Sequence, residues 1–292
     1  MSVSDLPRYD FCHVESLAAL CDMLSSRNGK GMVLLAGGTD FMVEVSQGAP
    51  RRGALPLVVD ISRMPELGGI DWDGTRLRIG AAVSYLELAR HAAVAEHAPL
   101  LAAMTYDIGG PTIQARGTLG GNFATASPAA DGVAAIAAFD PIIEVQSVRG
   151  RRRIAMADLQ TGYKTSTRAD DEVIVAFELE PPPPGTPWVW RKVGTRMAQA
   201  ISKVALAAVA QIDDGVVTRF GAAMASVAPV TALLPNVRKL MTGARVDEVD
   251  AAALDAAVEA DVAPIDDVRS TREYRAHCAK ALVRSFVISL RH

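Results

Sequence analysis

In the first part of the chain, some segments have apolar residues at the spacing of a helix face, and others are short apolar runs typical of strands. From Ser16 to Leu24 the apolar residues recur at the spacing of one helix face, and Asn28-Gly29 supplies a stop. The apolar run from Met32 to Leu35 then predicts a strand. LPLVVDIS at 55–62 predicts a second strand. LRIGAAVSYLELARH at 77–91 predicts a strand and then a helix, which Ser84 and Glu87 open at capping-box spacing.

The next stretch, residues 134–180, reads as β-rich. PIIEVQSV and RGRRRIAM flank a glycine turn, and DEVIVAFELE alternates in character, so we expect antiparallel hairpins. PPPPGTP, from Pro181 to Pro187, has too few backbone donors for a helix or a central strand and is typical of a stiff spacer. We therefore predict a domain at 1–180, a linker at 181–187 and a second domain at 188–292.

The second domain combines strands and helices. ISKVALAAVAQIDDGVVTRFGAAMASVAP holds two strand-like runs around the turn Asp214-Gly215. VDEVDAAALDAAVEA predicts an Ala-rich helix, and STREYRAHCAKALVRSFVISL predicts a final helix with Ser270 as its cap. The pattern predicts an α+β protein with a smaller α+β domain at its C-terminal end.

The stretch LLAGGTDFM, residues 34–42, places two glycines directly after a predicted strand. Glycine accepts the φ values that a nest of amides requires, so the N–H groups of Gly37, Gly38 and Thr39 could converge on an anion such as a phosphate. A tight turn alone is the other interpretation. The chain contains neither GxGxxG nor GxxxxGK[ST], so neither a Rossmann fingerprint nor a P-loop explains the pair.

A second glycine-rich stretch, IGGPTIQARGTLGGNFATASPAAD at 108–131, leaves little room for a regular element. Long irregular segments inside a compact domain are usually functional. Thr118, Asn122, Thr125 and Ser127 offer hydroxyl and amide partners, and Gly120-Gly121 offers another close approach of the backbone. Two such loops predict a ligand with two phosphates, or an extended body lying between the loops.

Composition narrows the function classes. The 292 residues carry 30 basic and 33 acidic side chains and are half hydrophobic, so we expect a globular chain with no general attraction to nucleic acid. The N-terminus lacks a secretory pattern and no apolar run is long enough to span a membrane, which predicts a soluble cytoplasmic protein. The three cysteines form no CxxC pair and the five histidines show no ligand spacing, so we assign no metal.

The motifs AGGTDFM and IQARGTLGGNFATASPAAD together closely resemble those of the FAD-binding medium subunit of the molybdenum hydroxylases. This group includes xanthine dehydrogenase, carbon monoxide dehydrogenase and 4-hydroxybenzoyl-CoA reductase. TGYKTS, RKVGTRMAQAISKVALAA and PIDDVRSTREYRAHCAKALVRS follow in the same order, so the resemblance covers nearly the full chain. It implies a vanillyl-alcohol-oxidase-type FAD-binding domain of two α+β subdomains, with FAD in the cleft, and a smaller C-terminal α+β domain.

The resemblance also implies which residues bind the cofactor. The first loop would hold the pyrophosphate by backbone amides, with the glycines leaving room for the diphosphate, and the second would wrap FAD. Ile108 would lie over the flavin ring, and Lys192 would place a cation near its pyrimidine end. The full set of implied cofactor-binding residues is Leu34, Leu35, Ala36, Gly37, Gly38, Thr39, Asp40, Phe41, Ile108, Thr118, Leu119, Gly120, Gly121, Asn122, Asp131, Ile174 and Lys192.

The function implied by the resemblance is electron transfer. The substrate would be hydroxylated at molybdenum, held by molybdopterin, in a large partner subunit. A small partner subunit would relay electrons through [2Fe-2S] clusters to FAD in this chain, and from there to NAD⁺, a quinone or oxygen. The chemistry would belong to the flavin, so we predict no catalytic side chain. Two alternatives stay open: a self-sufficient flavin oxidoreductase on the same fold, and a non-catalytic nucleotide- or coenzyme-binding module.

The basic run Arg149, Arg151, Arg152 and Arg153 also allows two interpretations. A short basic hairpin turn is usually solvated. The alternative is a docking site for a partner subunit.

Overall fold

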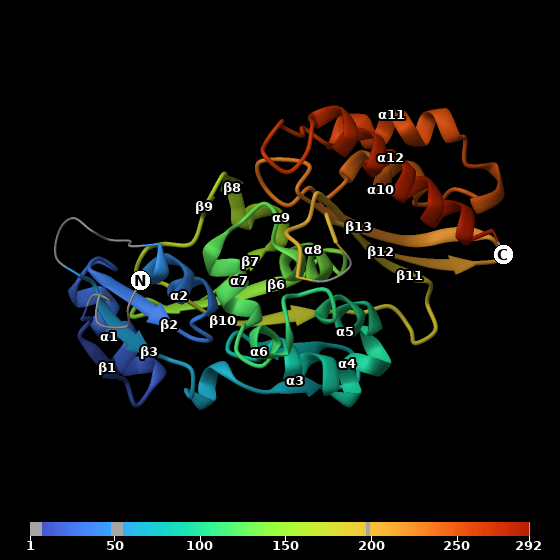
Figure 1. Ribbon diagram of the computed structural model, residues 1–292. Coiled ribbons are helices and arrows are strands. Elements are labelled where there is room, and N and C mark those ends of the chain that lie inside the picture. The colour runs from blue at the N-terminus through green and yellow to red at the C-terminus, as the bar shows by residue number, and fades with distance from the viewer. Residues whose placement is uncertain (1–7, 48–54, 197–198, 292) are drawn as a thin grey trace.

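Three larger sheets organise the structure, a computed structural model that describes residues 8–47, 55–196 and 199–291 (Figure 1). The first sheet is parallel, in the order β1-β3-β2, and packs on α1. Its elements are β1 (Phe11–His13), α1 (Leu17–Ser26), β2 (Met32–Leu35), α2 (Thr39–Ser46), β3 (Leu57–Asp60) and the 3-10 helix η2 (Pro65–Leu67). The predicted strands and first helix are confirmed, and Asn28 and Gly29 both take positive φ at the predicted stop.

The second sheet is antiparallel, in the order β4-β5-β10-β6-β7. Its strands are β4 (Ile70–Trp72), β5 (Leu77–Gly80), β6 (Ile142–Ser147), β7 (Gly150–Ala155) and β10 (Val173–Leu179). The predicted hairpin between 141 and 156 is the β6–β7 pair, and the third predicted strand, β10, lies between β5 and β6. A two-stranded ladder joins β8 (Gln160–Gly162) to β9 (Thr165–Ser166).

Helices between β5 and β6 cover this sheet. They are α3 (Tyr85–Arg90), α4 (Ala92–His97), α5 (Pro99–Thr105), α6 (Pro111–Gln114), α7 (Leu119–Thr125) and α8 (Asp131–Ala137), and α9 (Met156–Leu159) follows β7. The capping box of Ser84 and Glu87 is confirmed. The prediction that residues 108–131 are irregular was wrong, because α6 and α7 lie inside the segment and α8 begins at its end. The pattern did not indicate α7 because Gly120 and Gly121 are poor helix formers.

The third sheet belongs to the C-terminal part and runs β11-β12-β13, all antiparallel. Its elements are β11 (Trp188–Val193), β12 (Val204–Asp213), β13 (Val216–Ala225), α10 (Pro235–Met241), the 3-10 helix η3 (Val246–Glu248), α11 (Ala251–Asp261) and α12 (Arg272–Ser289). The predicted hairpin turn is confirmed, with Asp214 and Gly215 both at positive φ. The cap of the last helix is Thr271 rather than Ser270, because the Thr271 hydroxyl accepts the N–H of Tyr274.

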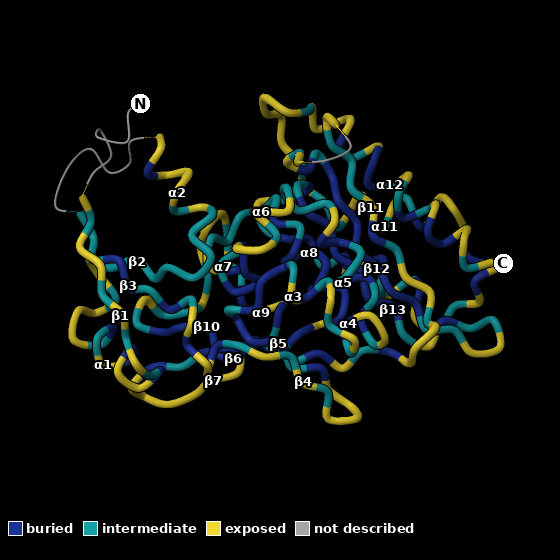
Figure 2. Tube along the Cα trace, turned by 60° about the horizontal axis from the view of Figure 1, so that its bottom comes forward, coloured by how far each residue is buried: buried dark blue, intermediate teal, exposed yellow. Residues whose placement is uncertain are grey.

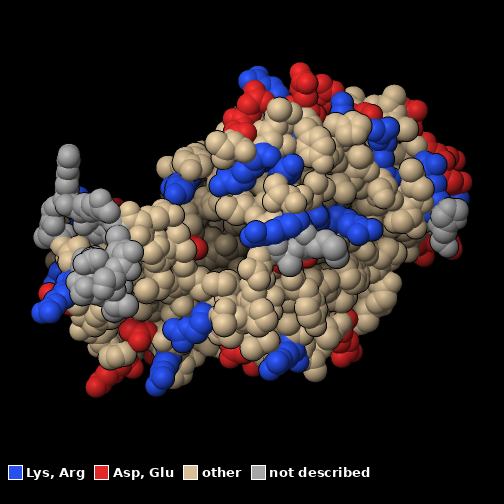
Figure 3. Space-filling view, viewed as in Figure 1, with Lys and Arg blue, Asp and Glu red and all other residues tan. Residues whose placement is uncertain are grey.

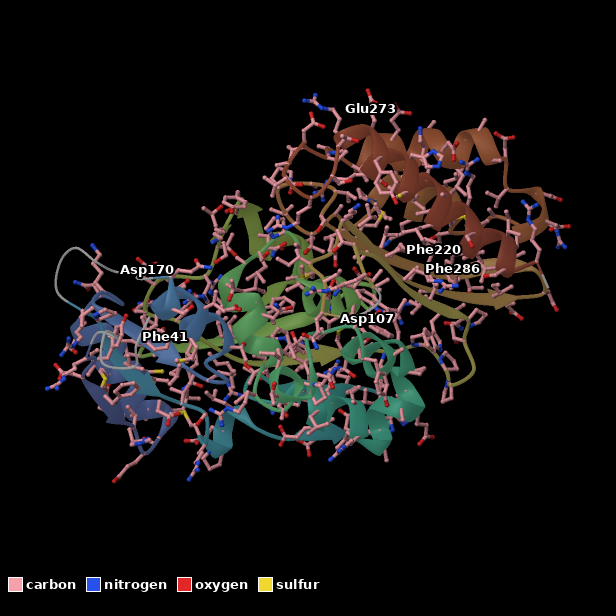
Figure 4. The ribbon with its side chains drawn as sticks, viewed as in Figure 1. Phe41, Asp107, Asp170, Phe220, Glu273 and Phe286 are labelled. Carbon is pink, nitrogen blue, oxygen red and sulfur yellow. The ribbon has the colours of Figure 1, made fainter. Side chains whose placement is uncertain are left out.

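Strand β12 is buried on both faces and joins the two parts of the molecule (Figure 2). Ala205, Ala207 and Val209 face the core that contains α8, whereas the alternate residues face the core beneath α10 to α12, where Phe220 and Phe286 meet (Figure 4). Small side chains bring the layers close, and a Cβ at Gly221 would lie 2.0 Å from the Ala138 carbonyl oxygen. The Ala-rich strands therefore serve close packing of a helix on a sheet.

Candidate functional site

The first glycine pair connects β2 to α2. Gly38 precedes the helix with φ of 75°, in the left-handed region that favours glycine, and no side chain caps the helix start. Within the described residues, the N–H groups of Thr39, Asp40 and Phe41 find no acceptor, whereas Met42 donates to the Gly38 carbonyl. The start of α2 therefore presents free donors and the positive end of the helix dipole, an arrangement that suits a phosphate.

Gly37 has a different reason to lack a side chain. A Cβ there would lie 1.8 Å from the carbonyl oxygen of Arg116, which precedes the second glycine pair. The two loops cross at this point, and backbone fills the space beside Gly37. We expected both glycines to leave room for a diphosphate, but at Gly37 the structure shows a contact between protein segments.

The second glycine pair begins α7, and its amides are already used. Leu119 donates to the Val83 carbonyl at 3.2 Å, Gly120 donates to the Ala81 carbonyl at 2.9 Å, and Gly121 donates to the Thr118 hydroxyl at 3.1 Å. A Cβ at Gly120 would lie 2.5 Å from the Ala81 oxygen. This loop therefore packs against the segment after β5, and side chains of α7, not its first amides, are left to meet a ligand.

A hydrogen bond joins the two loops across the site. The Thr125 hydroxyl, at the end of α7, donates to the Asp40 carboxylate at 2.7 Å. Asp40 lies in the first turn of α2, where a negative charge also favours the helix start. The two motifs are 85 residues apart in sequence, and this bond holds them together at the rim of one cavity.

That cavity has a volume of about 520 Å³, and a second cavity of about 280 Å³ adjoins it. Leu34, Ala36, Gly121 and Ala124 line both. Figure 3 shows the surface hollowed between the N-terminal part and the rest of the molecule, with Lys and Arg side chains near the hollow. Two adjoining cavities of this size suit an elongated ligand such as a dinucleotide.

Most of the predicted site residues meet in these cavities. Those that line the larger one are Leu34, Leu35, Ala36, Gly37, Gly38, Thr39, Asp40, Phe41, Ile108, Thr118, Gly121 and Asn122. Gly120 and Ile174 line the smaller cavity, together with Arg168, Asp170 and Glu172. Leu119 is fully buried in the core, and Asp131 and Lys192 line neither cavity.

Asp131 and Lys192 form a buried ion pair instead. Lys192 Nζ lies 2.6 Å from Asp131 Oδ2 and donates to the carbonyl of Asp107 at 2.8 Å. The Ser202 hydroxyl donates to the other oxygen of Asp131. Burial raises the pKa of the Asp131 carboxyl, against the opposing effects of Lys192 and Ser202. Lys192 therefore pairs with a buried carboxylate, and its place near the pyrimidine end of the flavin stays a prediction.

Sequence reasoning missed several residues that line the larger cavity: Glu44, Tyr85, Ile113, Gly117 and Lys164. Tyr85 is the most informative. Its hydroxyl and Asn122 Oδ1 are buried, and neither has a hydrogen-bond partner in the described part of the chain. Tyr85 lies outside both glycine motifs, so no local pattern in the sequence indicated it. Buried polar groups of this kind suit a polar ligand in the cavity.

The basic hairpin does not present free arginines. Arg149 pairs with Asp171 at 2.5 Å, Arg152 with Glu172 at 2.8 Å, and Arg153 with Glu178 at 2.7 Å. Arg151 lies 3.6 Å from Glu144. These partially exposed pairs, which join β7 and its turn to β6, to β10 and to the segment before β10, favour a role within the sheet.

Two family models match the chain, one after the other. The first describes the FAD-binding domain in molybdopterin dehydrogenase and matches residues 7–182. The chain belongs to this family. The second model describes the CO dehydrogenase flavoprotein C-terminal domain and matches residues 190–290 of this FAD-binding subunit.

Curated relatives extend over nearly the whole FAD-binding subunit. It is 28% identical to the xanthine dehydrogenase FAD-binding subunit of Escherichia coli O157:H7, over 96% of each chain. It is 28% identical to the nicotine 6-hydroxylase medium subunit of Paenarthrobacter nicotinovorans, over 97% of each chain. The carbon monoxide dehydrogenase medium chain of Hydrogenophaga pseudoflava is 27% identical over 95% of each chain.

Solved structures agree in fold. Carbon monoxide dehydrogenase from Hydrogenophaga pseudoflava, in a form that lacks the Mo-pyranopterin moiety, matches with a TM-score of 0.88 and 26% identity, over 96% of both chains. Quinoline 2-oxidoreductase from Pseudomonas putida 86 matches in fold with a TM-score of 0.85 at 21% identity, over 98% of both chains. The predicted family, the α+β fold with its smaller C-terminal domain, the FAD cofactor and the oxidoreductase class are confirmed.

The site fits FAD on the evidence of its own atoms. The free amides of α2 suit the pyrophosphate, the unpartnered Tyr85 and Asn122 atoms suit a polar ligand, and the apolar Ile108 and Ile113 suit a flat ring. The protein is thus an FAD-binding subunit of a molybdenum hydroxylase-type dehydrogenase. Among the described residues, no helix is both long and apolar enough to cross a membrane. The cytoplasmic location stays a prediction.

Proposed function

We propose that this chain is the electron-transfer subunit of a heterotrimeric molybdopterin-dependent dehydrogenase. Its partners are a large molybdopterin-binding subunit and a small [2Fe-2S] subunit, and it passes electrons from the clusters through FAD to NAD⁺ or another acceptor. The relatives named as medium chains or FAD-binding subunits support an assembly of several chains. The observation that carries the proposal is the free helix start of α2, which lines the larger of two adjoining cavities that together suit a dinucleotide, in a chain of this family.

FAD supplies a redox centre when it is bound, and the residues of this chain hold and orient it. The amides of Thr39, Asp40 and Phe41 bind the pyrophosphate, and Gly38 keeps their approach open. Ile108, which lines the larger cavity, would cover the flavin ring, and Ile174, which lines the smaller cavity, would be a further contact for the cofactor. Lys192, paired with Asp131, donates a hydrogen bond to the carbonyl of Asp107 (Figure 4) and so holds the residue that precedes Ile108 in place.

We further propose that the protein divides into an FAD-binding domain at 1–180, a proline-rich linker at 181–187 and a C-terminal domain at 188–292. The linker lies between β10 and β11. The first family model ends at residue 182, and the second begins at residue 190. Limited proteolysis followed by mass spectrometry measures where the boundary falls. Because proteases cleave poorly next to proline, the resistant fragments decide: fragments that end and begin close to 181–187 support the division, and a resistant fragment that spans this segment contradicts it.

The proposed function is tested on the native complex, purified without a tag from its own host. We expect flavin absorption bands, bound molybdenum and iron, and two further subunits. Flavin on a lone chain that turns over substrate by itself supports the self-sufficient oxidoreductase instead. A chain that binds FAD without any NADH- or dye-linked turnover in its complex supports the non-catalytic module.

The acceptor is tested separately, under anaerobic conditions. Rapid bleaching of the flavin by NADH supports NAD⁺ as the acceptor, because the electron transfer is reversible at the flavin. Bleaching by substrate but not by NADH contradicts NAD⁺ and directs the search to a quinone or oxygen.

A further inference from the structure

Tyr85 is held against the second glycine loop by its own backbone. Its N–H donates to the Gly117 carbonyl at 3.0 Å, and Ser84 pairs with Thr118 in an isolated bridge. The ring packs under Gly117, where a Cβ would lie 3.4 Å from Tyr85 Cδ2. The side chain is 3% exposed, so the position of its hydroxyl is fixed by the core.

The hydroxyl of Tyr85 and the amide oxygen of Asn122 both lie close to Gly132. A Cβ at Gly132 would lie 2.4 Å from Tyr85 Oη and 2.8 Å from Asn122 Oδ1. Both atoms are buried, and no described residue pairs with either. Glycine at 132, inside α8, is therefore the residue that leaves room for both polar atoms, which lie near the same point without forming a hydrogen bond.

The two ends of the Asn122 amide have different surroundings. Oδ1 is buried next to the Tyr85 hydroxyl, whereas Nδ2 is not among the fully buried unpaired atoms and donates to no described residue. Asn122 also lines the larger cavity. An amide whose oxygen points inward presents its N–H groups to the cavity, and an amide that flips presents an acceptor instead.

We propose that Tyr85 is a positioning residue for cofactor binding: its hydroxyl donates to Asn122 Oδ1 and thereby directs the Asn122 N–H groups to an acceptor atom of bound FAD. This inference rests on the proposed FAD site. A small rotation about the soft terminal torsion of Asn122 completes the bond. In the flipped amide, the Asn122 N–H would donate to the phenol oxygen and leave the buried Tyr85 O–H without an acceptor among the described residues, so the inward-facing oxygen is favoured. Burial, Asp131 and Asp40 raise the pKa of Tyr85, so the hydroxyl keeps its proton.

The test is a double-mutant cycle on the full chain, with FAD removed and then titrated back by flavin fluorescence. We expect Tyr85→Phe to weaken FAD binding about tenfold, since one hydrogen bond is lost from the bound state. Asn122→Ala removes the same interaction from the other side. In the Asn122→Ala background, Tyr85→Phe should change the affinity less than about twofold, because the two residues act as one unit.

A second measurement separates this role from a purely structural one. The cofactor-free Tyr85→Phe protein should melt at the wild-type temperature or above, because the lost hydroxyl is unpaired without FAD. Tyr274→Phe, on α12 in the C-terminal part, is the matched control and should leave FAD affinity unchanged.

Three results overturn the inference: an unchanged affinity in Tyr85→Phe, effects that add in the double variant, or a lower melting temperature of the cofactor-free Phe variant. A wild-type chain that binds no FAD overturns the proposed function, and this inference falls with it.

Discussion

The two glycine pairs are alike in sequence but have different structural roles. Gly37-Gly38 ends β2 and leaves the first amides of α2 without acceptors, whereas Gly120-Gly121 begins α7 with its amides already bonded to the segment 81–83 and to Thr118. Even within one pair the causes differ. Gly38 is required by its positive φ, and Gly37 by the carbonyl of Arg116.

A glycine pair in the sequence therefore indicates that some group packs closely against the backbone, but it does not identify that group. At Gly37 and Gly120 the approaching group is protein backbone. Of the helix starts at the two glycine pairs, that of α2 keeps amide donors without acceptors among the described residues, and that of α7 does not. Substitutions at the two pairs should therefore separate loss of folding from loss of cofactor.

The largest expected effect is at the second pair. Gly120→Val should lower the free energy of unfolding by about 3 kcal/mol or more, because its Cβ would lie 2.5 Å from a buried carbonyl oxygen. Urea denaturation of the cofactor-free chain measures this. Gly150→Val, at a turn with open space around its Cβ, is a comparison limited to the strain of positive φ. Equal losses at both positions would contradict a packing role for Gly120.

The next effect is at the first pair. Gly38→Val should abolish FAD retention and leave the C-terminal domain folded. A β-branched residue resists φ of 75°, and its side chain would keep the pyrophosphate from the amides at the start of α2. Flavin content of the purified chain and its circular dichroism measure the two parts. Gly38→Asn, which tolerates the left-handed region, should retain part of the flavin. Full flavin in the Val variant would mean that the pyrophosphate does not bind here.

A smaller effect is expected where the two pairs are joined. Thr125→Val removes the hydrogen bond to Asp40 and should lower the free energy of unfolding by about 1 kcal/mol. Asp40→Ala, which removes the acceptor, provides the other arm of a thermodynamic cycle, measured by chemical denaturation. Additive losses in the double variant would show that the bond does not couple the loops.

The smallest expected effect is on the pH dependence of stability, through Glu172, which lines the smaller cavity together with Gly120. The Arg152 guanidinium holds the pKa of Glu172 below its ordinary value of 4.5. A lowered pKa means that the unfolded chain binds the proton more tightly, so the stabilisation is present above the unfolded value and is lost as the pH falls through the folded one. Glu172→Gln should be less stable than wild type at pH 7, with the difference shrinking below about pH 4. A pH-independent difference would exclude this ion pair as the cause.

Much of the fold was accessible from local pattern. The helix of residues 16–24, the capping box of Ser84 and the hairpin turn at Asp214-Gly215 all depend on neighbours in the sequence, and the structure has each of them. The error at 108–131 has the opposite cause. There α7 is made of LGGNFAT, and packing against Ala81 outweighs the low helix propensity of its glycines.

The features of the candidate site likewise fall into those that local motifs indicated and those that tertiary contacts set. The sequence by itself determined the family, the cofactor class and the two loops, because glycine, hydroxyl and amide residues stand at fixed spacing within short motifs. Only the tertiary structure decided which amides remain free, that Lys192 is paired with Asp131, and that Tyr85 lies beside Asn122 and Gly132. These facts depend on which distant segment supplies the acceptor, the counter-charge or the contact. No local pattern carries that information, because it arises when the chain packs.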